Sequence, residues 1–595
     1  MKDIRLIYTP VCSFEDFKKA ANNAKELGAT HFMAGQLPRS RWMWEEDLSN
    51  PYVNWSMGQA QIFKLKCPEQ LKEFLPQNHI NECFAIFKER CQYLKEIGLK
   101  PGLFSNEPFW LPEEVYRKHP DWRGARCDHP RRSKKPYYSP CIENPEVLEM
   151  YKWAISEICK ETGLDYINFK TNDCGGGLSY SSGTYSGPNG ASRYKNVSMT
   201  DQVCGFIDAI YEGAREGGIM EPVVHFSSDL EFKEPEYSVN AAIVKLKDNQ
   251  LINHKDKYGN NMMKVVGGTG LTETVIPGLP KNIALVSSLS GLVTSDAPIK
   301  ILKLSSTDLE EGVEIFKTVI RRTPENVAEE FSCLYESACN IVGTKLAGKL
   351  VNVWKDIDDA QKHVEDMGLD LIQYGCMHQR WINRPFVLFP EELTDEDSNY
   401  YSRFQFQAQG KEHSYDLMDL QGIEGVRGFA SVFIIKEIAR KAANKLDSAV
   451  YGLDCITNEL SDGKDTCKAK IVLLKRRLLV YKCFIENIKN ACEFQELVDR
   501  TDKESRLVLS LRWPTRGDSR AEEFQRITRN EIDNAYELSR LCEGHMDELF
   551  VCADKDEFED IFTFSRKLPE QLIKKAEIML DHMIDGARVF ETNNI

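Results

Sequence analysis

The chain has 595 residues, of which 42% are hydrophobic, 10% aromatic and 28% charged, and its formal net charge is -15. This length exceeds one ordinary hydrophobic core, so two or three domains are expected, and the composition is that of a folded globular protein. An acidic chain without a long basic run is a poor partner for nucleic acid. No stretch approaches the roughly 18 apolar residues of a membrane span.

The N-terminal residues and the cysteines predict where the protein resides. The first residues, MKDIRLIYTP, pass directly into a strand-like run and leave no room for a signal peptide. The 18 cysteines stand singly between Cys12 and Cys552 without a CxxC pair, which is typical of reduced thiols. The sequence therefore predicts a cytoplasmic protein with no membrane partner.

Strand-like runs alternate with amphipathic helical patterns over the first part of the chain, as they do in βα units. Short apolar or β-branched runs predict five strands, at residues 4–9, 29–35, 99–105, 164–170 and 222–228. Helical spacing of apolar residues predicts the helices between them, at residues 13–28, 79–98, 144–163 and 199–218. Two later apolar runs, AAIVKL at 241–246 and NIALVSSLSGLV at 282–293, are the expected further strands.

This order of elements fits either an open doubly wound sheet or a closed (β/α)8 barrel of the TIM type. Polar insertions follow the strands, as active-site loops do on the C-terminal face of a barrel, and no glycine-rich nucleotide motif follows the first strand. We therefore expect the α/β class, with a (β/α)8 catalytic barrel over residues 1–305.

Helical patterns dominate the remainder of the chain. Residues 306–390 are predicted to form a helical extension, and residues 391–595 a mainly α-helical C-terminal domain. Apolar residues at alternating spacings of three and four predict one long helix with a packing seam, formed by Ile471, Leu474, Leu478, Tyr481, Ile485 and Ile488. We expect this seam to pack on the barrel or on a second copy of the chain, the latter giving a homo-oligomer.

Residues 374–393 interrupt the helical patterns with prolines and aromatic residues. One hypothesis is that this segment reaches over the barrel mouth, where His378 and Trp381 would contact a substrate. The alternative is a plain linker between domains.

The insertion after the second predicted strand is too polar to be core throughout. It gathers arginines and tryptophans, namely Arg39, Arg41, Trp42, Trp44 and Trp55. Tryptophan faces pack on sugar rings, and arginines bind hydroxyls or carboxylates, so the insertion predicts substrate subsites. The alternative is that two of the three tryptophans anchor the loop by packing.

The third predicted strand leads into Asn106 and Glu107, with Phe109 and Trp110 close behind. A glutamate beside apolar rings loses hydration, and its pKa rises toward the range of a general acid. Glu107 is therefore a candidate catalytic residue, and Asn106 and Trp110 are candidate substrate contacts. The alternative is that Glu107 pairs with a nearby arginine.

The fourth strand leads into KTNDCGGG, which supplies Asn172 and Asp173, and the fifth into HFSSDLEF, which supplies His225 and Asp229. Carboxylates at several strand ends around one mouth suit the acid/base cleavage of an acetal. We expect Asp173 and Asn172 to be catalytic and the other two to bind substrate.

The glycines after Asp173 give the backbone room to approach a ligand, and Tyr180 and Tyr185 can close over it. A long surface loop is the alternative explanation of this segment. Cys174 is better explained as a buried thiol than as a nucleophile. No HExxH, GxSxG or zinc-type Cys–His spacing occurs, so neither a metal nor another cofactor is expected.

With these residues assembled, the first 300 or so residues resemble TIM-barrel glycoside hydrolases, most nearly the group that contains the β-N-acetylhexosaminidases and the α-glucuronidases. In the substrate-assisted families two adjacent polar residues follow the fourth strand, and Asn172 and Asp173 match them in kind. The resemblance implies that Asn172 steadies a 2-acetamido group and that Asp173 is the general acid. Aspartate replaces the more usual glutamate, which shortens the reach of the acid.

The SNEP segment also resembles the Asn–Glu pair of the large retaining clan, whose glutamate is the acid/base. Here it follows the third predicted strand rather than the fourth, so Asn106 and Glu107 depart from that pattern. The helical half resembles no family that we can name.

The sequence thus predicts a glycoside hydrolase that acts on an oligosaccharide or glycan by carboxylate acid/base catalysis, with or without assistance from a 2-acetamido group. Two alternatives stay open at this point. One is a carbohydrate-binding protein without turnover, and the other is a metal-dependent sugar isomerase or epimerase, since fold analogy alone does not choose among them.

Overall fold

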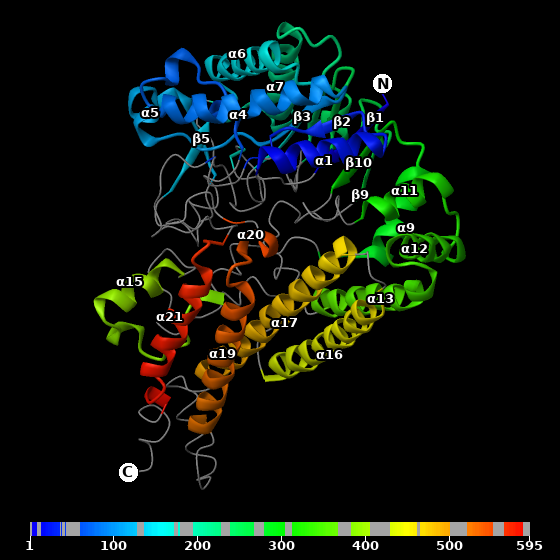
Figure 1. Cartoon of the computed structure of the whole chain (residues 1–595). Coiled ribbons are helices and arrows are strands. Elements are labelled where there is room, and N and C mark those ends of the chain that lie inside the picture. Colours follow the sequence, from blue (N-terminus) through cyan, green and yellow to red (C-terminus); the bar gives the residue numbers. More distant parts are fainter. Residues whose placement is uncertain are drawn as a thin grey trace. The chain divides into compact units, whose positions relative to one another are not determined.

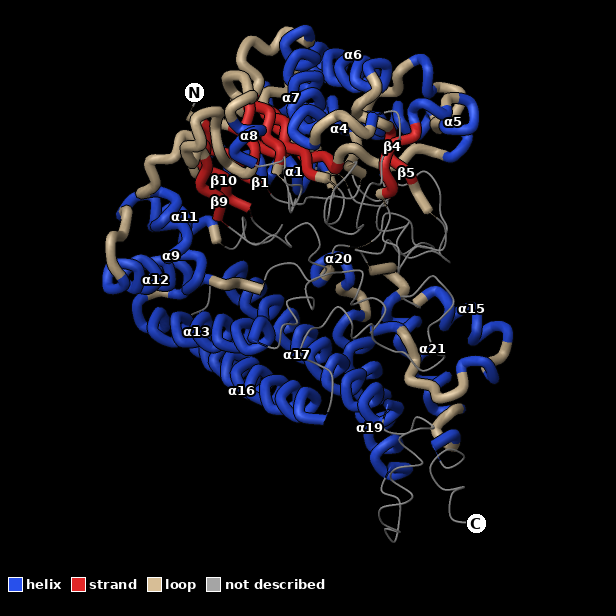
Figure 2. Tube along the Cα trace, turned by 180° about the vertical axis from the view of Figure 1, so that it is seen from behind, coloured by secondary structure: helices blue, strands red, loops and turns tan. Residues whose placement is uncertain are grey.

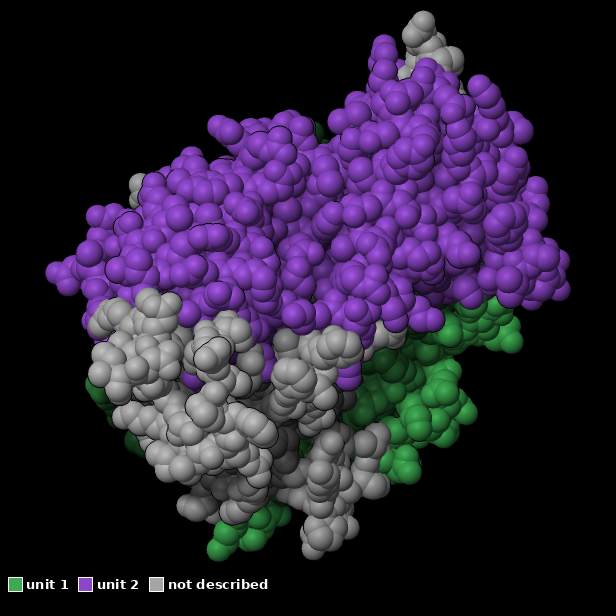
Figure 3. All heavy atoms as spheres, turned by 90° about the horizontal axis from the view of Figure 1, so that it is seen from below, with its two compact units in different colours: residues 1–272, 291–313 green, residues 273–290, 314–595 purple. Residues whose placement is uncertain are grey.

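The structure is a computed structural model of the whole chain. It describes residues 3–8, 13–35, 37, 42, 60–127, 136–171, 177–178, 194–227, 239–266, 279–303, 312–366, 382–404, 429–460, 465–499, 520–550, 552 and 564–586. The chain divides into two compact units, coloured separately in Figure 3. Unit 1 comprises Met1–Thr272 and Gly291–Val313, and unit 2 comprises Glu273–Ser290 and Glu314–Ile595.

An eight-stranded parallel sheet forms the centre of unit 1. Its strands are β1 (Ile4–Tyr8), β2 (His31–Met33), β3 (Lys100–Asn106), β6 (Tyr166–Lys170), β7 (Val223–Phe226), β8 (Gln250–Ile252), β9 (Met263–Val266) and β10 (Ile299–Lys303). They pair in the order β8-β7-β6-β3-β2-β1-β10-β9, so the last strand in the chain lies beside the first. This is chain order wrapped into a ring, the order of an α/β barrel. The predicted α/β class and all five of the first strands are confirmed.

The interior of the curled sheet is filled by alternate side chains of its strands, because successive residues of a strand point to opposite faces. One apolar cluster takes residues from seven of the eight strands: Ile4, Leu6, Tyr8, Met33, Tyr166, Val223, Leu251, Met263, Ile299 and Ile301. It includes Leu251 of β8 and Met263 of β9, the two strands at the ends of the pairing order. Side chains therefore link the ends of the sheet across the interior.

Four long helices lie around the strands of unit 1 (Figures 1 and 2), and all four were predicted. They are α1 (Phe14–Glu26), α4 (Gln77–Glu96), α6 (Pro145–Thr162) and α7 (Met199–Glu216). Ser13 caps α1 by accepting a hydrogen bond from the Asp16 amide, and Gly28 follows the helix with φ +80°, a conformation that glycine adopts without strain. The local signals thus fix where this helix begins and ends.

Shorter elements complete the connections of unit 1: η1 (Ile62–Lys64), η2 (Glu69–Leu71), α5 (Glu113–Lys118), η3 (Pro120–Trp122), β4 (Arg123–Arg126), β5 (Tyr138–Pro140) and α8 (Val239–Ile243). Strands β4 and β5 form a separate antiparallel pair.

Both of the later strand predictions are wrong. Residues 241–246 fall on α8 and the turn after it, and residues 282–293 form helix α9 (Asn282–Val293). A continuous apolar run has no period that separates a strand from a buried helix, and twelve residues is a helical length. The true strands β8, β9 and β10 are only three to five residues long, so they gave a weak signal.

Beyond β10 the described elements are helical, as predicted. They are α11 (Val313–Arg322), α12 (Val327–Val342), α13 (Thr344–Asp366), η7 (Pro390–Glu392), α15 (Asp395–Arg403), α16 (Phe429–Glu459), α17 (Asp465–Asp499), α19 (Arg520–Cys542), α20 (Met546–Leu549) and α21 (Leu568–Asp581). Helices α12, α13, α16, α17, α19 and α21 each contact the next of this set in turn.

The predicted seam lies on α17, and its six residues are all buried. The domain boundaries expected at residues 305 and 390 stay predictions. The cysteines of the described ranges are free thiols, and no helix in those ranges is long and apolar enough to cross a membrane.

Candidate functional site

The structure describes five of the predicted site residues: Trp42, Asn106, Glu107, Trp110 and His225. The others lie outside the described residues, namely Arg39, Arg41, Trp44, Trp55, Asn172, Asp173, Tyr180, Tyr185, Asp229, His378 and Trp381. Glu107 directly follows β3, and His225 lies on β7 of the same sheet. The surroundings of the two side chains differ.

Glu107 comes directly after β3, and its side chain is 1% exposed. Its Oε1 accepts hydrogen bonds from the Ile62 amide at 2.6 Å and from the Ser105 hydroxyl at 2.8 Å. Its Oε2 accepts one from the Tyr151 hydroxyl, on α6, at 3.0 Å. The alternative hypothesis was that Glu107 pairs with a nearby arginine. Within the described part of the chain no arginine bonds this carboxylate, and its partners are Ile62, Ser105 and Tyr151.

Burial raises the pKa of Glu107 to about 7, which is the direction that the sequence predicts. The three hydrogen bonds and the charge of Lys64 act in the opposite direction and limit the rise. Lys64 is itself fully buried, and burial lowers its pKa to about 7. A carboxyl group with this pKa is in the range of a general acid, but both of its oxygens already accept bonds from the protein.

The other described residues near this strand end are buried as well. Asn106 lies at the end of β3, and its amide donates to the Ala60 carbonyl at 3.0 Å. Trp110 packs edge-on against Tyr137, with ring centroids 5.3 Å apart. Trp42 is 2% exposed, which agrees with the alternative that tryptophans of this insertion are packing anchors.

His225 lies on β7 and is 1% exposed. The register pairs it with Asn168 on β6 and Leu251 on β8, and Leu251 belongs to the interior cluster. Its Nδ1 lies 3.1 Å from the Tyr166 hydroxyl, and its Nε2 has no hydrogen-bond partner in the described part of the chain. The pKa of His225 falls well below 6.5, because burial and the nearby His254 and Lys303 disfavour a second positive charge.

The tautomer of His225 follows from counting buried donors. If Tyr166 donates to Nδ1, only the Nε2–H of His225 lacks an acceptor among these groups. If Nδ1 donates to Tyr166 instead, both the tyrosine proton and the Nε2 lone pair lack partners. Since buried polar groups avoid such losses, we assign the proton to Nε2. His225 is then a neutral imidazole with one N–H donor available inside the sheet.

His254 joins β8 to β9 beside this imidazole, with ring centroids 5.1 Å apart. Its Nδ1 lies 2.9 Å from the Met263 sulfur, and its carbonyl accepts a bond from the Met262 amide. Burial lowers the pKa of His254, and the charge of Lys303, which ends β10, lowers it further. Sequence reasoning missed Tyr166, His254 and Lys303, although the alternation of β6 could have placed Tyr166 on the same face as Asn168.

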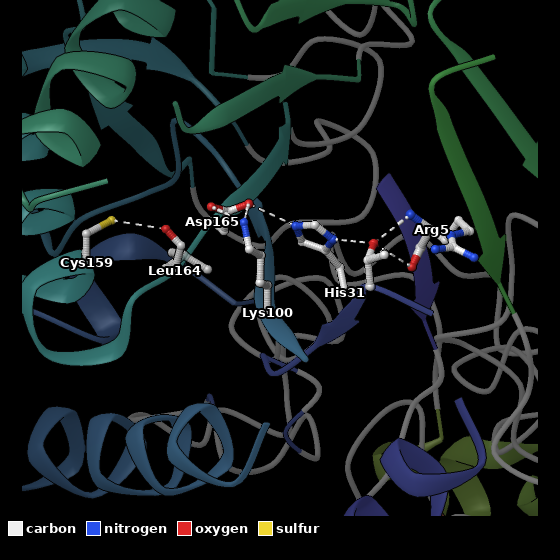
Figure 4. A network of polar contacts seen from close by, with 7 residues as sticks. Arg5, His31, Lys100, Cys159, Leu164 and Asp165 are labelled. Carbon is white, nitrogen blue, oxygen red and sulfur yellow. Dashed lines mark hydrogen bonds and ion pairs between the residues drawn. The ribbon is translucent and has the colours of Figure 1, made fainter. Parts of the chain in front are cut away.

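At the other end of the strands a second histidine has both nitrogens engaged (Figure 4). His31 Nε2 lies 2.9 Å from Asp165 Oδ2, and His31 Nδ1 lies 2.8 Å from the Thr30 hydroxyl. Lys100 donates to Asp165 at 3.3 Å, and the Arg5 amide donates to Thr30 at 2.9 Å. Thr30, His31, Lys100 and Asp165 begin or directly precede strands, and polar groups at this end of a barrel serve stability.

No group of three or more histidine, cysteine, aspartate or glutamate side chains gathers as a metal site in the described ranges. Within the described residues the candidate groups are the neutral imidazole of His225, on β7, and the buried carboxyl group of Glu107, directly after β3.

Comparison with known proteins gives likeness in structure only. No protein-family model matches the chain, and no curated protein matches it either. Among solved structures, a GH138 enzyme targeting pectin rhamnogalacturonan II has a TM-score of 0.52 and 9% sequence identity, with 100% of this chain and 84% of that enzyme covered. The chain thus shares the fold of a glycoside hydrolase along its whole length.

Two further structures are similar at a lower level. An O-GlcNAc hydrolase variant from Thermobaculum terrenum has a TM-score of 0.35 and 9% identity, with 91% of this chain and 96% of that one covered. A GH36 α-galactosidase from Geobacillus stearothermophilus has a TM-score of 0.28 and 14% identity, with 54% of this chain and 42% of that one covered. These two likenesses are too weak to carry an argument.

Proposed function

We propose that the protein is a glycoside hydrolase that cleaves a glycosidic bond of an oligosaccharide or glycan. The observation that carries the proposal is the likeness in fold, along the whole chain, to an enzyme that targets a pectin glycan. A sheet in barrel order that leads into acidic residues after its fourth and fifth strands supports the same reaction class.

Asp173 is the proposed proton donor, with Asn172 orienting the substrate beside it. Both follow β6 in the sequence, and the residue before them, Thr171, is buried directly after that strand. Glu107 is less suited to donate a proton, because its two oxygens accept three hydrogen bonds from Ile62, Ser105 and Tyr151. A proton donor must instead reach the leaving oxygen of the substrate.

His225 is the proposed contact to a substrate oxygen. Its neutral Nε2–H is buried without an acceptor, and a hydroxyl or ring substituent of a sugar supplies one. If the substrate carries a 2-acetamido group, Asn172 steadies that group so that it takes part in the reaction.

The test is a screen of aryl glycosides and pectin oligosaccharides, followed by Asp173→Asn. This change keeps the shape and removes the proton, so kcat on a natural glycoside falls by about 10²–10⁴, the usual worth of one acid/base group. An aryl glycoside with a good leaving group needs little protonation and loses much less.

Glu107→Gln is the matched control for that experiment. If Glu107→Gln rather than Asp173→Asn shows the dependence on the leaving group, Glu107 is the donor and the assignment of Asp173 is wrong. Binding of a sugar with no turnover of any substrate would replace the proposal with a carbohydrate-binding protein.

A further inference from the structure

Residues 60–64 follow the insertion after β2 in the sequence, and hydrogen bonds join them to the end of β3. The Ala60 carbonyl accepts bonds from the Asn106 amide at 3.0 Å and the Ser105 hydroxyl at 3.2 Å. Two residues further on, the Ile62 amide donates to Glu107 at 2.6 Å. The end of β3 thus bonds residues 60–64 three times.

The same carboxylate reaches the next two residues of η1 indirectly. Tyr151, which donates to the second oxygen of Glu107, stacks on Phe63 with ring centroids 4.3 Å apart and an interplanar angle of 29°. Lys64 is fully buried and interacts electrostatically with Glu107. The three residues of η1 are thus linked to one carboxylate: Ile62 by its amide, Phe63 by way of Tyr151, and Lys64 by electrostatic interaction.

Glu107 also joins β3 to β6 and to helix α6. Its amide donates to the Lys170 carbonyl at the end of β6 at 2.8 Å, and its side chain reaches α6 through Tyr151. A buried carboxylate with every oxygen bonded is costly to place, and it is stable only where its partners are fixed.

We propose that Glu107 is a positioning residue that fixes residues 60–64, which follow the insertion after β2 in the sequence, against the end of β3. The consequence for activity rests on the proposed function, because that insertion carries the predicted substrate contacts. Loss of the Glu107 carboxylate should therefore raise KM more than it lowers kcat.

Glu107→Gln and Glu107→Ala distinguish positioning from catalysis. Glutamine still offers a carbonyl oxygen to the Ile62 amide and the Ser105 hydroxyl, so kcat falls by no more than about threefold and the pH profile keeps its shape. Alanine leaves the Ile62 amide without its acceptor, so KM rises by about tenfold, a change that the glutamine variant rescues. A proton donor predicts instead that both variants lose about 10²-fold in kcat on natural glycosides and recover on activated aryl glycosides.

Hydrogen exchange of the peptide covering residues 60–64 gives a readout that needs no activity. We expect faster exchange in Glu107→Ala, slight acceleration in Tyr151→Phe, and exchange close to the unaltered protein in Glu107→Gln. The control is Glu161→Gln, which removes a partly exposed carboxylate that bonds Lys66 and Lys88 but no backbone amide of this stretch.

Unchanged exchange in both Glu107→Ala and Tyr151→Phe overturns the positioning role, whatever the activity. If the alanine variant does not fold, the tyrosine variant alone decides. A protein that turns over no glycoside refutes the proposed function, and the exchange experiment still decides the role of Glu107.

Discussion

Two buried histidines of the same sheet, His31 and His225, differ in how their second nitrogen is used. Both are nearly inaccessible, at 2% and 1% exposure. His31 has Asp165 on one nitrogen and Thr30 on the other, whereas His225 has Tyr166 on one nitrogen and no described partner on the other. Both nitrogens of His31 have hydrogen-bond partners within the fold, whereas the Nε2–H of His225 has no acceptor among the described residues.

Position along the strands explains the difference. His31 begins β2 and Asp165 directly precedes β6, so that network lies at the N-terminal ends, while His225 is the third residue of β7. In α/β barrels the N-terminal ends serve stability and the C-terminal ends carry the chemistry. Burial alone therefore does not tell a structural histidine from a ligand-binding one; what distinguishes the two is a ring nitrogen without a hydrogen-bond partner.

The largest expected effect is on stability, in Asp165→Ala. This change leaves the His31 Nε2–H and the Lys100 ammonium without their acceptor, so the free energy of unfolding falls by about 3 kcal/mol. Urea denaturation followed by tryptophan fluorescence measures it, and kcat per folded molecule stays near that of the unaltered protein. A loss of activity at full stability would show that the His31–Asp165 contact serves the reaction and not the stability of the fold.

His225→Phe should show the converse. The ring volume is nearly kept and the Nε2–H is lost, so kcat/KM on a cleaved glycoside falls about 10²-fold, or about 2.7 kcal/mol, with a small change in melting temperature. His225→Gln, which retains a side-chain N–H, should recover part of the rate. Equal losses of stability in His225→Phe and Asp165→Ala would show that His225, like His31, serves the stability of the fold.

The buried imidazole of His225 also makes stability depend on pH. The pKa of His225 is lowered in the folded state, so below pH 6.5 the unfolded chain binds a proton that the folded chain does not. Stability therefore falls with decreasing pH by about 1.4 kcal/mol per unit from this group alone. Denaturation curves between pH 5 and 7 should show that His225→Phe lacks this loss.

Other groups also titrate between pH 5 and 7. The quantity to measure is therefore the difference in free energy of unfolding between the unaltered protein and His225→Phe. Glu107 acts in the opposite direction, since its raised pKa makes the folded chain hold a proton between about pH 4.5 and 7, and it is present in both proteins. Parallel curves for the two proteins would mean that His225 is protonated in the folded state.

The smallest expected effect is that of Tyr166→Phe. It removes the hydroxyl that fixes the tautomer of His225, so kcat/KM falls by about fivefold, near 1 kcal/mol. Steady-state kinetics beside His225→Phe measures it. In the double variant the tyrosine change should add nothing, and an additive loss would show that Tyr166 acts independently of His225.

Much of the fold was predictable because its signals are local. Ser13 before an apolar period predicted α1, and the spacing from Ile471 to Ile488 predicted the buried face of α17. Strands β8 to β10 were missed because they are short, while the apolar run of α9 imitated a strand.

The site was less predictable, because its chemistry depends on residues far apart in the chain. Apolar neighbours of Glu107 predicted the direction of its pKa, but its partners Ile62 and Tyr151 lie 45 and 44 residues away. The contact of His225 with His254 requires β8 and β9 to be placed. No local pattern reports such contacts.

The pairing of β1 with β10 has a consequence for synthesis of the chain. Tyr8 lies opposite Lys303, and the difference, 303 minus 8, is 295 residues. At roughly 5–20 residues per second, a ribosome needs on the order of 15–60 s to supply that neighbour. During this interval the nascent chain carries β1 with one edge unpaired, and unpaired edges invite association with other chains. Helices α16, α17, α19 and α21 pack on helices nearer in the sequence, so the time between their synthesis and that of their packing partners is far shorter.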